Sequence, residues 1–189
     1  MGNILKLVSD VPPSVNHYLS YRGVMRGGKP MAMSYVTKQA QEYKRKFAEY
    51  VEQEIILQSW DVEPTKQLHF YVDAEFYFAR VDQDANNYFK VLLDAITDTK
   101  KIWLDDNVVC ERVQRILYDN KNPRIELTIH PVQYIGIFDD VSQYEQFLNR
   151  CVGCTRYARN CSTLKNAILG KVQDGVTNFE CDQFKVRRI

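Results

Sequence analysis

Four aspartates and a lysine are the residues whose types and spacing could support phosphodiester hydrolysis. Asp82 and Asp84 lie where an alternating apolar segment gives way to a helical pattern, and Asp105 and Asp106 lie in a later loop. Carboxylates that converge on one point repel each other unless a hard cation lies between them, and Mg²⁺ prefers such oxygen ligands. A bound Mg²⁺ lowers the pKa of an attacking water and polarises the phosphodiester. Lys90 could neutralise charge on the same phosphate.

Each aspartate also has an ordinary structural interpretation. An aspartate at a helix start is commonly a cap for backbone N–H groups, and two aspartates in a loop commonly close a turn. The metal-site hypothesis therefore requires the fold to bring the two pairs together. If successive elements pack side by side, both pairs emerge at one edge of a sheet, where loops can direct the carboxylates toward one point.

A second chemically distinctive group is formed by cysteines. The chain has five, and four of them have the spacing Cys151-x2-Cys154-x6-Cys161-x19-Cys181. A Cys-x-x-Cys knuckle with Gly153 inside it favours a tight turn around a shared metal. We predict a structural Zn²⁺ bound by these four thiolates, with a Cys₄ iron–sulfur cluster and unliganded cysteines as alternatives. The fifth, Cys110, lies in a strand pattern and is expected in the core.

Composition indicates the class of protein but does not identify its binding partners. The chain has 189 residues, of which 45% are hydrophobic, and this content favours a packed core over global disorder. Its net charge of +1 neither favours nor excludes nucleic acid. No apolar run approaches the roughly 18 residues needed to span a bilayer, and the N-terminus lacks a signal-peptide pattern. We therefore expect a cytoplasmic protein without membrane association.

Positive charge is concentrated in one stretch of the chain. Between residues 22 and 46 there is one acidic residue, Glu42, and there are seven basic ones: Arg22, Arg26, Lys29, Lys38, Lys44, Arg45 and Lys46. Such a stretch could bind phosphates even though the whole chain is nearly neutral, because binding depends on local charge. The alternative is a solvated loop and helix face.

Hydrophobic periodicity predicts the elements that must position these residues. A short strand is expected over residues 4–8, and the glycines and prolines of residues 20–34 predict a mobile loop. Apolar residues at spacings of three and four predict a helix over residues 35–57. Strict alternation predicts a strand over residues 70–78.

The following segments predict a helix and a hairpin. The helix is expected over residues 88–97, and strands over 108–118 and 124–130 are joined by a short Asn/Lys/Pro turn that favours an antiparallel pair. The order strand, helix, strand, helix, strand, strand predicts an α+β fold, close to α/β, with helices packed on a small mixed sheet. This domain is expected to span residues 1–133, and residues 134–189 are expected to form a cysteine-rich extension.

Three segments resemble the RusA family of Holliday-junction resolvases and occur in that family's order. They are Pro12-Pro13-Ser14-Val15-Asn16-His17-Tyr18, then Asp82-Gln83-Asp84-Ala85-Asn86-Asn87-Tyr88-Phe89-Lys90 with Leu93-Asp94-Ala95, and Trp103-Leu104-Asp105-Asp106-Asn107. The first is similar to a family signature of proline, serine, asparagine and tyrosine. The second resembles paired aspartates with an asparagine and a lysine, and the third resembles a tryptophan with an Asp-Asp loop. The resemblance covers about residues 3–131.

The resemblance implies a Mg²⁺-dependent endodeoxyribonuclease that nicks branched DNA, such as four-way junctions, in recombination, repair or phage DNA processing. It also implies a homodimer, and an isologous dimer matches the near two-fold symmetry of a junction. The predicted DNA-contacting residues are Asn16, Arg22, Arg26, Lys29, Lys44 and Lys46. For Asn16 and for Tyr18, bracing of the fold is an equal alternative.

The family's catalytic lysine and later aspartate are carried over by motif. Lys90 takes the position of the lysine, and Asp106 takes the position of the aspartate, with the adjacent Asp105 as an alternative. The resemblance thus implies that Asp106 is a Mg²⁺ ligand and that Lys90 acts on the scissile phosphate.

The family's aspartate pair can be placed in two ways. Counting back from the lysine puts Asp84 and Asn86 at the pair, whereas a two-residue insertion puts Asp82 and Asp84 there. We prefer Asp82 and Asp84 as catalytic Mg²⁺ ligands, because two carboxylates suit Mg²⁺ better than a carboxylate and an amide.

Three functions are distinguishable by simple observations. A structure-selective endonuclease nicks junctions with Mg²⁺, and this is the function we favour. A DNA-binding module that has lost the metal site binds junctions without nicking them, with the cysteine extension as a docking part. A cluster-bearing redox or sensing protein on a nuclease-like scaffold is brown, because iron–sulfur clusters absorb visible light.

Overall fold

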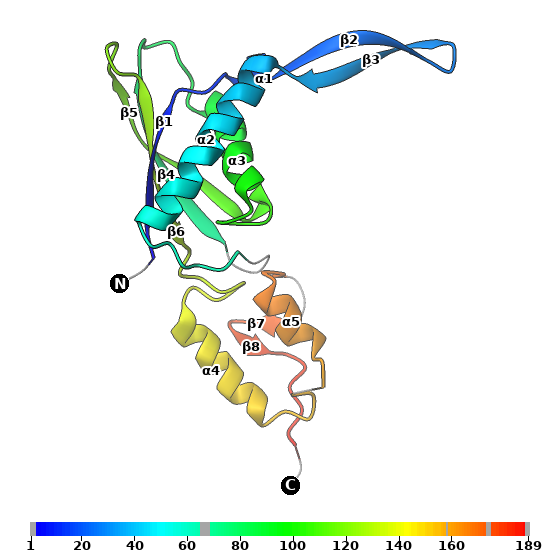
Figure 1. The fold of residues 1–189 in the computed structure, drawn as a ribbon. Coiled ribbons are helices and arrows are strands. Elements are labelled where there is room, and N and C mark those ends of the chain that lie inside the picture. Colours follow the sequence, from blue (N-terminus) through cyan, green and yellow to red (C-terminus); the bar gives the residue numbers. More distant parts are fainter. Residues whose placement is uncertain (1–2, 65–68, 158, 173–174, 188–189) are drawn as a thin grey trace. The chain divides into compact units, whose positions relative to one another are not determined.

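A four-stranded sheet forms the centre of the first of two units. The computed structural model describes residues 3–64, 69–157, 159–172 and 175–187. It divides the chain into Met1–Pro131 and Val132–Ile189. The strand order in the first unit is β1-β6-β4-β5, with bounds β1 Leu5–Asp10, β4 Phe70–Phe78, β5 Val109–Tyr118 and β6 Arg124–Pro131. β4 pairs with β5 in parallel and with β6 antiparallel, so the sheet is mixed and the predicted α+β class is confirmed (Figure 1).

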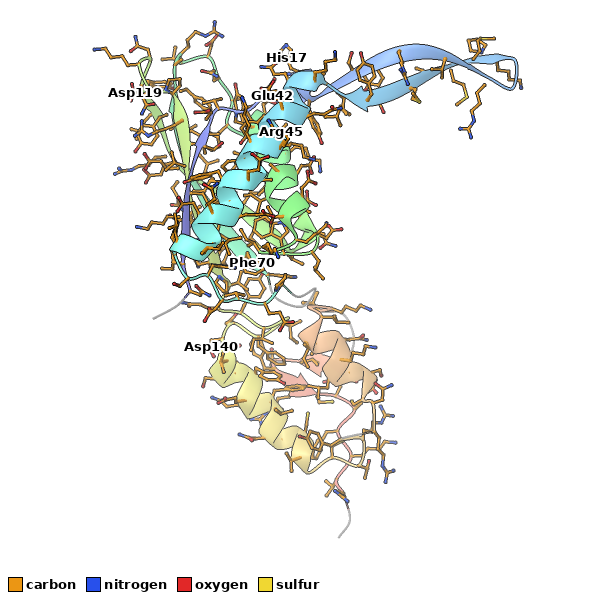
Figure 2. The ribbon with its side chains drawn as sticks, viewed as in Figure 1. His17, Glu42, Arg45, Phe70, Asp119 and Asp140 are labelled. Carbon is orange, nitrogen blue, oxygen red and sulfur yellow. The ribbon has the colours of Figure 1, made fainter. Side chains whose placement is uncertain are left out.

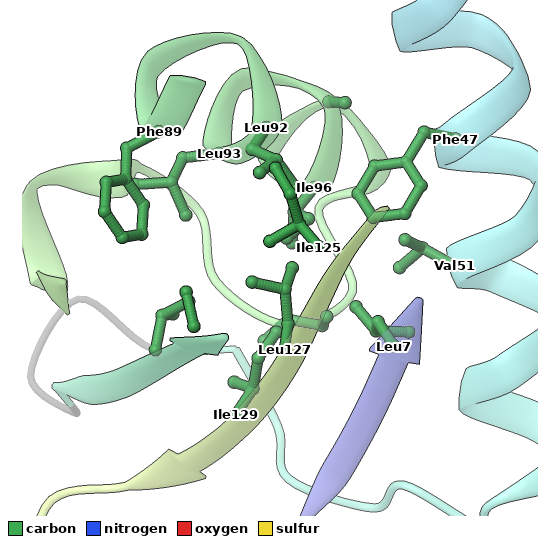
Figure 3. Packing of buried hydrophobic residues seen from close by; sticks show 14 of the residues in the cluster. Leu7, Phe47, Val51, Phe89, Leu92, Leu93, Ile96, Ile125, Leu127 and Ile129 are labelled. Carbon is green, nitrogen blue, oxygen red and sulfur yellow. The ribbon is translucent and has the colours of Figure 1, made fainter. Parts of the chain in front are cut away.

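Alternation along the strands explains why helices cover one face of this sheet. Every second residue of β4, beginning with Phe70, is buried, and the residues between are half-buried. Helices α2 Lys38–Leu57 and α3 Asn86–Thr99 pack on the buried face. The contact is made by Phe47, Val51, Phe89, Leu92, Leu93 and Ile96 from the helices and by Leu7, Ile125, Leu127 and Ile129 from the sheet (Figure 3). Burying each such side chain contributes about 1.5–3 kcal/mol, which fixes the helices against the sheet.

Side-chain hydrogen bonds to the backbone lie at or just before the starts of the two helices. The Thr37 side chain accepts a hydrogen bond from the Ala40 N–H, so α2 begins at residue 38 and not at the predicted residue 35. Before α3, the Asp84 carboxylate accepts a hydrogen bond from the Asn86 N–H at 3.0 Å. α3 ends where Lys100 adopts a φ of 53°. It therefore extends beyond the predicted residues 88–97 at both ends.

The segment expected to be a mobile loop is a two-stranded ribbon instead. β2 Leu19–Arg26 pairs antiparallel with β3 Lys29–Val36. Gly27 and Gly28 form the turn with φ values of 58° and 76°, which glycine adopts without steric cost. The ribbon extends away from the short helix α1 Val15–Tyr18 (Figure 1), and its strands are largely exposed. The glycines thus mark a hairpin turn.

The predicted hairpin of β5 and β6 is wrong, because β4 lies between these two strands. β5 runs parallel to β4, so the segment after β4 and the loop before β5 belong to opposite ends of this strand pair. The expectation that both aspartate pairs emerge at one sheet edge is therefore wrong. The predicted core position of Cys110 is also wrong: it is half-buried and lies in register with Tyr71, on the face away from the helices.

The second unit has short elements and few buried apolar residues. It contains α4 Val141–Val152, α5 Ser162–Ile168, β7 Val176–Thr177 and β8 Glu180–Cys181. Its core consists of Phe138, Phe147 and Ala167, with half-buried residues around them. Over the part of the chain that the structure describes, no helix combines the length and the apolar character needed to cross a membrane.

Candidate active site

Lys90 lies between two carboxylates at the surface of the first unit. Its ammonium donates hydrogen bonds to Asp94 Oδ1 at 2.7 Å and to Asp106 Oδ2 at 3.3 Å. Lys90 and Asp94 share a face of α3 because they are four residues apart, and Asp106 begins the short 3₁₀ helix η1 Asp106–Val108. The lysine side chain is 53% exposed, so a phosphate can reach it. The hydrogen bond to Asp94 contributes most to raising the pKa of Lys90, which is therefore a cation at neutral pH.

Asp94 is a site residue to which the sequence reasoning gave no role. Its second oxygen accepts a hydrogen bond from Tyr18 Oη at 2.6 Å. Burial, and then this bond to Asp94, raise the pKa of Tyr18 to about 12, so the hydroxyl remains a donor at neutral pH. Tyr18 belongs to the first motif and Lys90 to the second, so Asp94 joins the two motifs. The four-residue spacing of Lys90 and Asp94 is the signal that would have indicated this pair.

The structure distinguishes the two neighbouring aspartates of the third motif. The Asp105 carboxylate accepts a hydrogen bond from the Asn107 N–H at 3.1 Å and so caps η1. Asp106 instead contacts Lys90, and its side chain is 32% exposed. The geometry thus places Asp106, and not Asp105, beside the lysine.

Glu111 is a further acidic residue near this group. It lies on β5 in register with Val72, on the sheet face that the helices cover. Loss of surrounding water, followed by the negative charge of Asp106, raises the pKa of Glu111. The carboxyl groups of Glu111 and Asp106 are therefore close enough to affect each other electrostatically. Sequence alone gave no signal for Glu111, because its face depends on how β5 pairs with β4.

Asp82 and Asp84 are exposed, and their contacts are local. Asp82 forms an ion pair with Arg80 at 3.2 Å, and Asp84 receives the Asn86 N–H before α3. Within residues 3–64, 69–157, 159–172 and 175–187, no three or more histidine, cysteine, aspartate or glutamate side chains are arranged to hold a metal ion. The structure thus joins Lys90 to Asp106 but does not bring the predicted pair and Asp106 into one three-carboxylate group.

A family model for the endodeoxyribonuclease RusA matches residues 10–130. The chain belongs to the RusA family. This family consists of endodeoxyribonucleases that resolve Holliday junctions, so the resemblance carried by the three motifs is confirmed. The matched residues include Tyr18, Lys90, Asp94 and Asp106, and they end before the second unit. No curated protein matches the chain significantly.

The basic residues of this RusA-family chain fall into two groups. In α2, each of three consecutive cations has an acidic partner: Lys44 pairs with Asp98, Arg45 with Glu49, and Lys46 with Glu42. Figure 2 labels Glu42 and Arg45 on this helix. Lys44, with a side chain only 18% exposed, ties α2 to α3. These ion pairs reduce the charge that the predicted contacts Lys44 and Lys46 present to DNA.

The β2–β3 ribbon presents its positive charge without such neutralisation. Arg22, Arg26 and Lys29 form no ion pair with any residue that the structure describes, and no acidic residue occurs between Leu19 and Val36. The Arg22 guanidinium lies 5.9 Å from the centroid of the Tyr35 ring. Asn16, in α1 at the base of the ribbon, is exposed. The ribbon is thus the most cationic surface among the predicted DNA contacts.

The four cysteines of the second unit line one small cavity. Cys151 lies in α4, Cys154 follows it, Cys161 precedes α5, and Cys181 lies in β8. Burial contributes most to raising the pKa of Cys151 to about 11, and electrostatic interactions with the other three cysteines also raise it. Hydrogen bonds from the backbone N–H groups of Lys185 and Arg156 lower the pKa of Cys154. All four are free thiols.

Proposed function

We propose that this RusA-family protein hydrolyses phosphodiester bonds of branched DNA, such as four-way junctions, with Mg²⁺ as cofactor. The observation that carries the proposal is the contact between Lys90 and Asp106. Their separate motifs converge at 3.3 Å on an accessible surface. The processes we propose are recombination, repair or phage DNA processing, in the cytoplasm.

Lys90 has the position and charge to bind a scissile phosphate. Its ammonium keeps the short bond to Asp94 while it exchanges the longer one to Asp106 for a phosphate oxygen. Such a charge-assisted bond neutralises negative charge that develops during hydrolysis. Asp94 and Tyr18 act as positioning residues, because they hold the lysine without reaching the substrate.

The acidic residues near Lys90 fit the chemistry of Mg²⁺. This ion takes one or two protein carboxylates and retains several waters, so a complete set of three is not required. Asp106 would hold it, with Glu111 as the neighbouring carboxyl group. When bound, Mg²⁺ lowers the pKa of an attacking water and offsets the charge of the phosphate.

The β2–β3 ribbon is the proposed DNA-contacting arm. Its three cations can bind backbone phosphates, which provides affinity without selecting a sequence. We further propose a homodimer, since an isologous dimer presents two such arms and two sites to a junction of near two-fold symmetry.

A junction-binding protein without catalysis is the second candidate. It is favoured by the local contacts of Asp82 and Asp84, which occupy both carboxylates with neighbouring residues. Altered spacing in this motif could thus have removed catalysis while the cationic ribbon retained DNA binding.

Cleavage of a labelled four-way junction separates the two candidates. The pure protein is assayed with Mg²⁺, with a chelator, and with a linear duplex of the same sequence. Nicks near the crossover that require Mg²⁺ and do not occur in the duplex are the expected result. Tight junction binding without nicks, across several divalent metals, would favour the binding protein.

A further inference from the structure

Four cysteines from four places in the second unit line a single small cavity. Cys151, Cys154, Cys161 and Cys181 all line a cavity of about 20 Å³. Phe147, Leu164 and Phe184 also line it, so its surroundings are mainly apolar. Two, six and 19 residues separate successive cysteines in the sequence, and helix α4, the start of α5 and strand β8 bring them together. Because the cysteines are not all neighbours in the sequence, it is the fold that brings them to one cavity.

The backbone around Cys154 forms a tight turn. The Cys154 N–H donates to the Cys151 carbonyl at 2.9 Å, which closes the turn after α4. The backbone N–H groups of Arg156 and Lys185 point at the Cys154 sulfur. Hydrogen bonds of this kind stabilise a metal-bound thiolate from outside the ligand shell. Gly153 has a φ of −79°, so the turn does not require glycine, contrary to the sequence-based expectation.

Among the residues of the second unit that the structure describes, the fully buried apolar cluster is small. The unit spans Val132–Ile189, and three hydrophobic residues form its fully buried cluster. Units below roughly 70 residues commonly require disulfides or a structural metal. The four thiols are not paired in disulfides. A metal ion would link α4, α5 and β8 at one point.

We propose that Cys151, Cys154, Cys161 and Cys181 bind one structural Zn²⁺. Zn²⁺ prefers four thiolates in tetrahedral geometry. The side chains share the cavity without already forming a coordination shell among the described residues, so binding requires them to turn toward its centre. The cavity volume of about 20 Å³ is enough for a single water-sized or ion-sized occupant. An iron–sulfur cluster, with four or eight iron and sulfide atoms, requires more space. This site is independent of the proposed nuclease function.

Metal analysis of the full-length protein tests the assignment. We expect about one Zn²⁺ per chain after purification or after titration and dialysis. Replacing Zn²⁺ with Co²⁺ should give visible absorption typical of tetrahedral thiolate coordination. Failure of the wild-type chain to retain Zn²⁺, or isolation of a brown protein containing iron and sulfide, would overturn the proposal. Neither result requires a variant that folds.

Single substitutions then identify the ligands. Cys154→Ser and Cys161→Ser should each lower Zn²⁺ affinity at least tenfold and change the Co²⁺ spectrum, because each removes one thiolate. Cys110→Ser is the matched control, since this cysteine lies in the first unit, and it should bind as the wild type does. Asp106→Asn should also leave the Zn²⁺ content unchanged. Equal Zn²⁺ loss in the Cys110 and Cys154 variants would contradict the four-cysteine site.

Discussion

Replacing Asp94 with asparagine measures how much one carboxylate contributes to the position of Lys90. The change keeps the side-chain shape but leaves one acceptor oxygen in place of two: Lys90 can keep this oxygen, while the amide NH₂ faces Tyr18 Oη. The variant keeps a hydrogen bond from the charged Lys90 ammonium and loses the ion pair with the carboxylate. Exposed ion pairs contribute about 0.2–1 kcal/mol, and Lys90 is 53% exposed, so the expected loss is about 1 kcal/mol. At 1.36 kcal/mol per tenfold change, nicking by Asp94→Asn should be roughly five- to tenfold slower.

The assay is single-turnover nicking of a four-way junction at saturating protein, with junction binding measured separately. We expect slower nicking with unchanged binding. The fall of the nicking rate at alkaline pH should also begin at a lower pH in the variant than in the wild type, because Asp94 contributes most to raising the pKa of Lys90. Asp98→Asn is the control, since Asp98 lies one turn further along α3 and pairs with Lys44. Wild-type nicking by Asp94→Asn, or an equal loss in both variants, would refute the positioning role.

Three further predictions concern DNA binding and stability. Replacing all three ribbon cations (Arg22, Arg26 and Lys29) with alanine should reduce the slope of log affinity against log salt by about 2–3, whereas Lys46→Ala should change it little, because Glu42 already pairs with Lys46. Asp73→Asn should lower the free energy of unfolding at pH 7 by about 1–2 kcal/mol, because this carboxylate accepts two bonds from Arg112. Phe76→Ala should cost about 3–5 kcal/mol in denaturant unfolding, because the ring is fully buried against Phe78 and Phe89.

The Asp73 prediction has a defined pH dependence. Partial burial raises the pKa of this carboxyl, but hydrogen bonds from Arg112, Gln114 and His130 outweigh burial and hold it below its ordinary value of 3.8. The stabilisation is thus fully present above pH 3.8 and fades as the pH falls through the lowered pKa. A constant difference between wild type and Asp73→Asn down to low pH would contradict this account. An unchanged salt slope in the triple alanine variant would contradict the ribbon prediction. A loss of unfolding free energy below about 1 kcal/mol in Phe76→Ala would contradict the prediction for Phe76.

The elements with strong periodicity were predictable from sequence, and those defined by pairing were not. β4 alternates along its whole length because one face packs against helices, and α2 and α3 have apolar stripes for the same reason. The β2–β3 ribbon has no buried face, so its strands lack alternation, and its glycines indicate only a loop. The placement of β4 between β5 and β6 depends on long-range pairing that a short turn between those strands does not reveal.

The site residues given by local motifs were predictable from the sequence, whereas those that depend on long-range strand pairing were not. Motifs indicated Lys90 and Asp106, and the structure places them in contact. Asp94 could have been recognised from its spacing to Lys90 on a helix. Glu111 could not, because its position beside Asp106 follows from the pairing of β5 with β4. For Asp82 and Asp84 the structure contains local contacts: an ion pair with Arg80 and a hydrogen bond from the Asn86 N–H just before α3.

The most direct test of the account compares Asp106→Asn with Asp105→Asn in junction nicking and junction binding. Asp106 contacts Lys90, whereas Asp105 caps η1. Asp106→Asn should therefore bind the junction as tightly as the wild type and nick it about 100-fold more slowly or worse. Asp105→Asn should retain nicking within a few-fold of the wild-type rate. Wild-type nicking by Asp106→Asn would contradict the assignment of the Lys90–Asp106 contact as the catalytic centre.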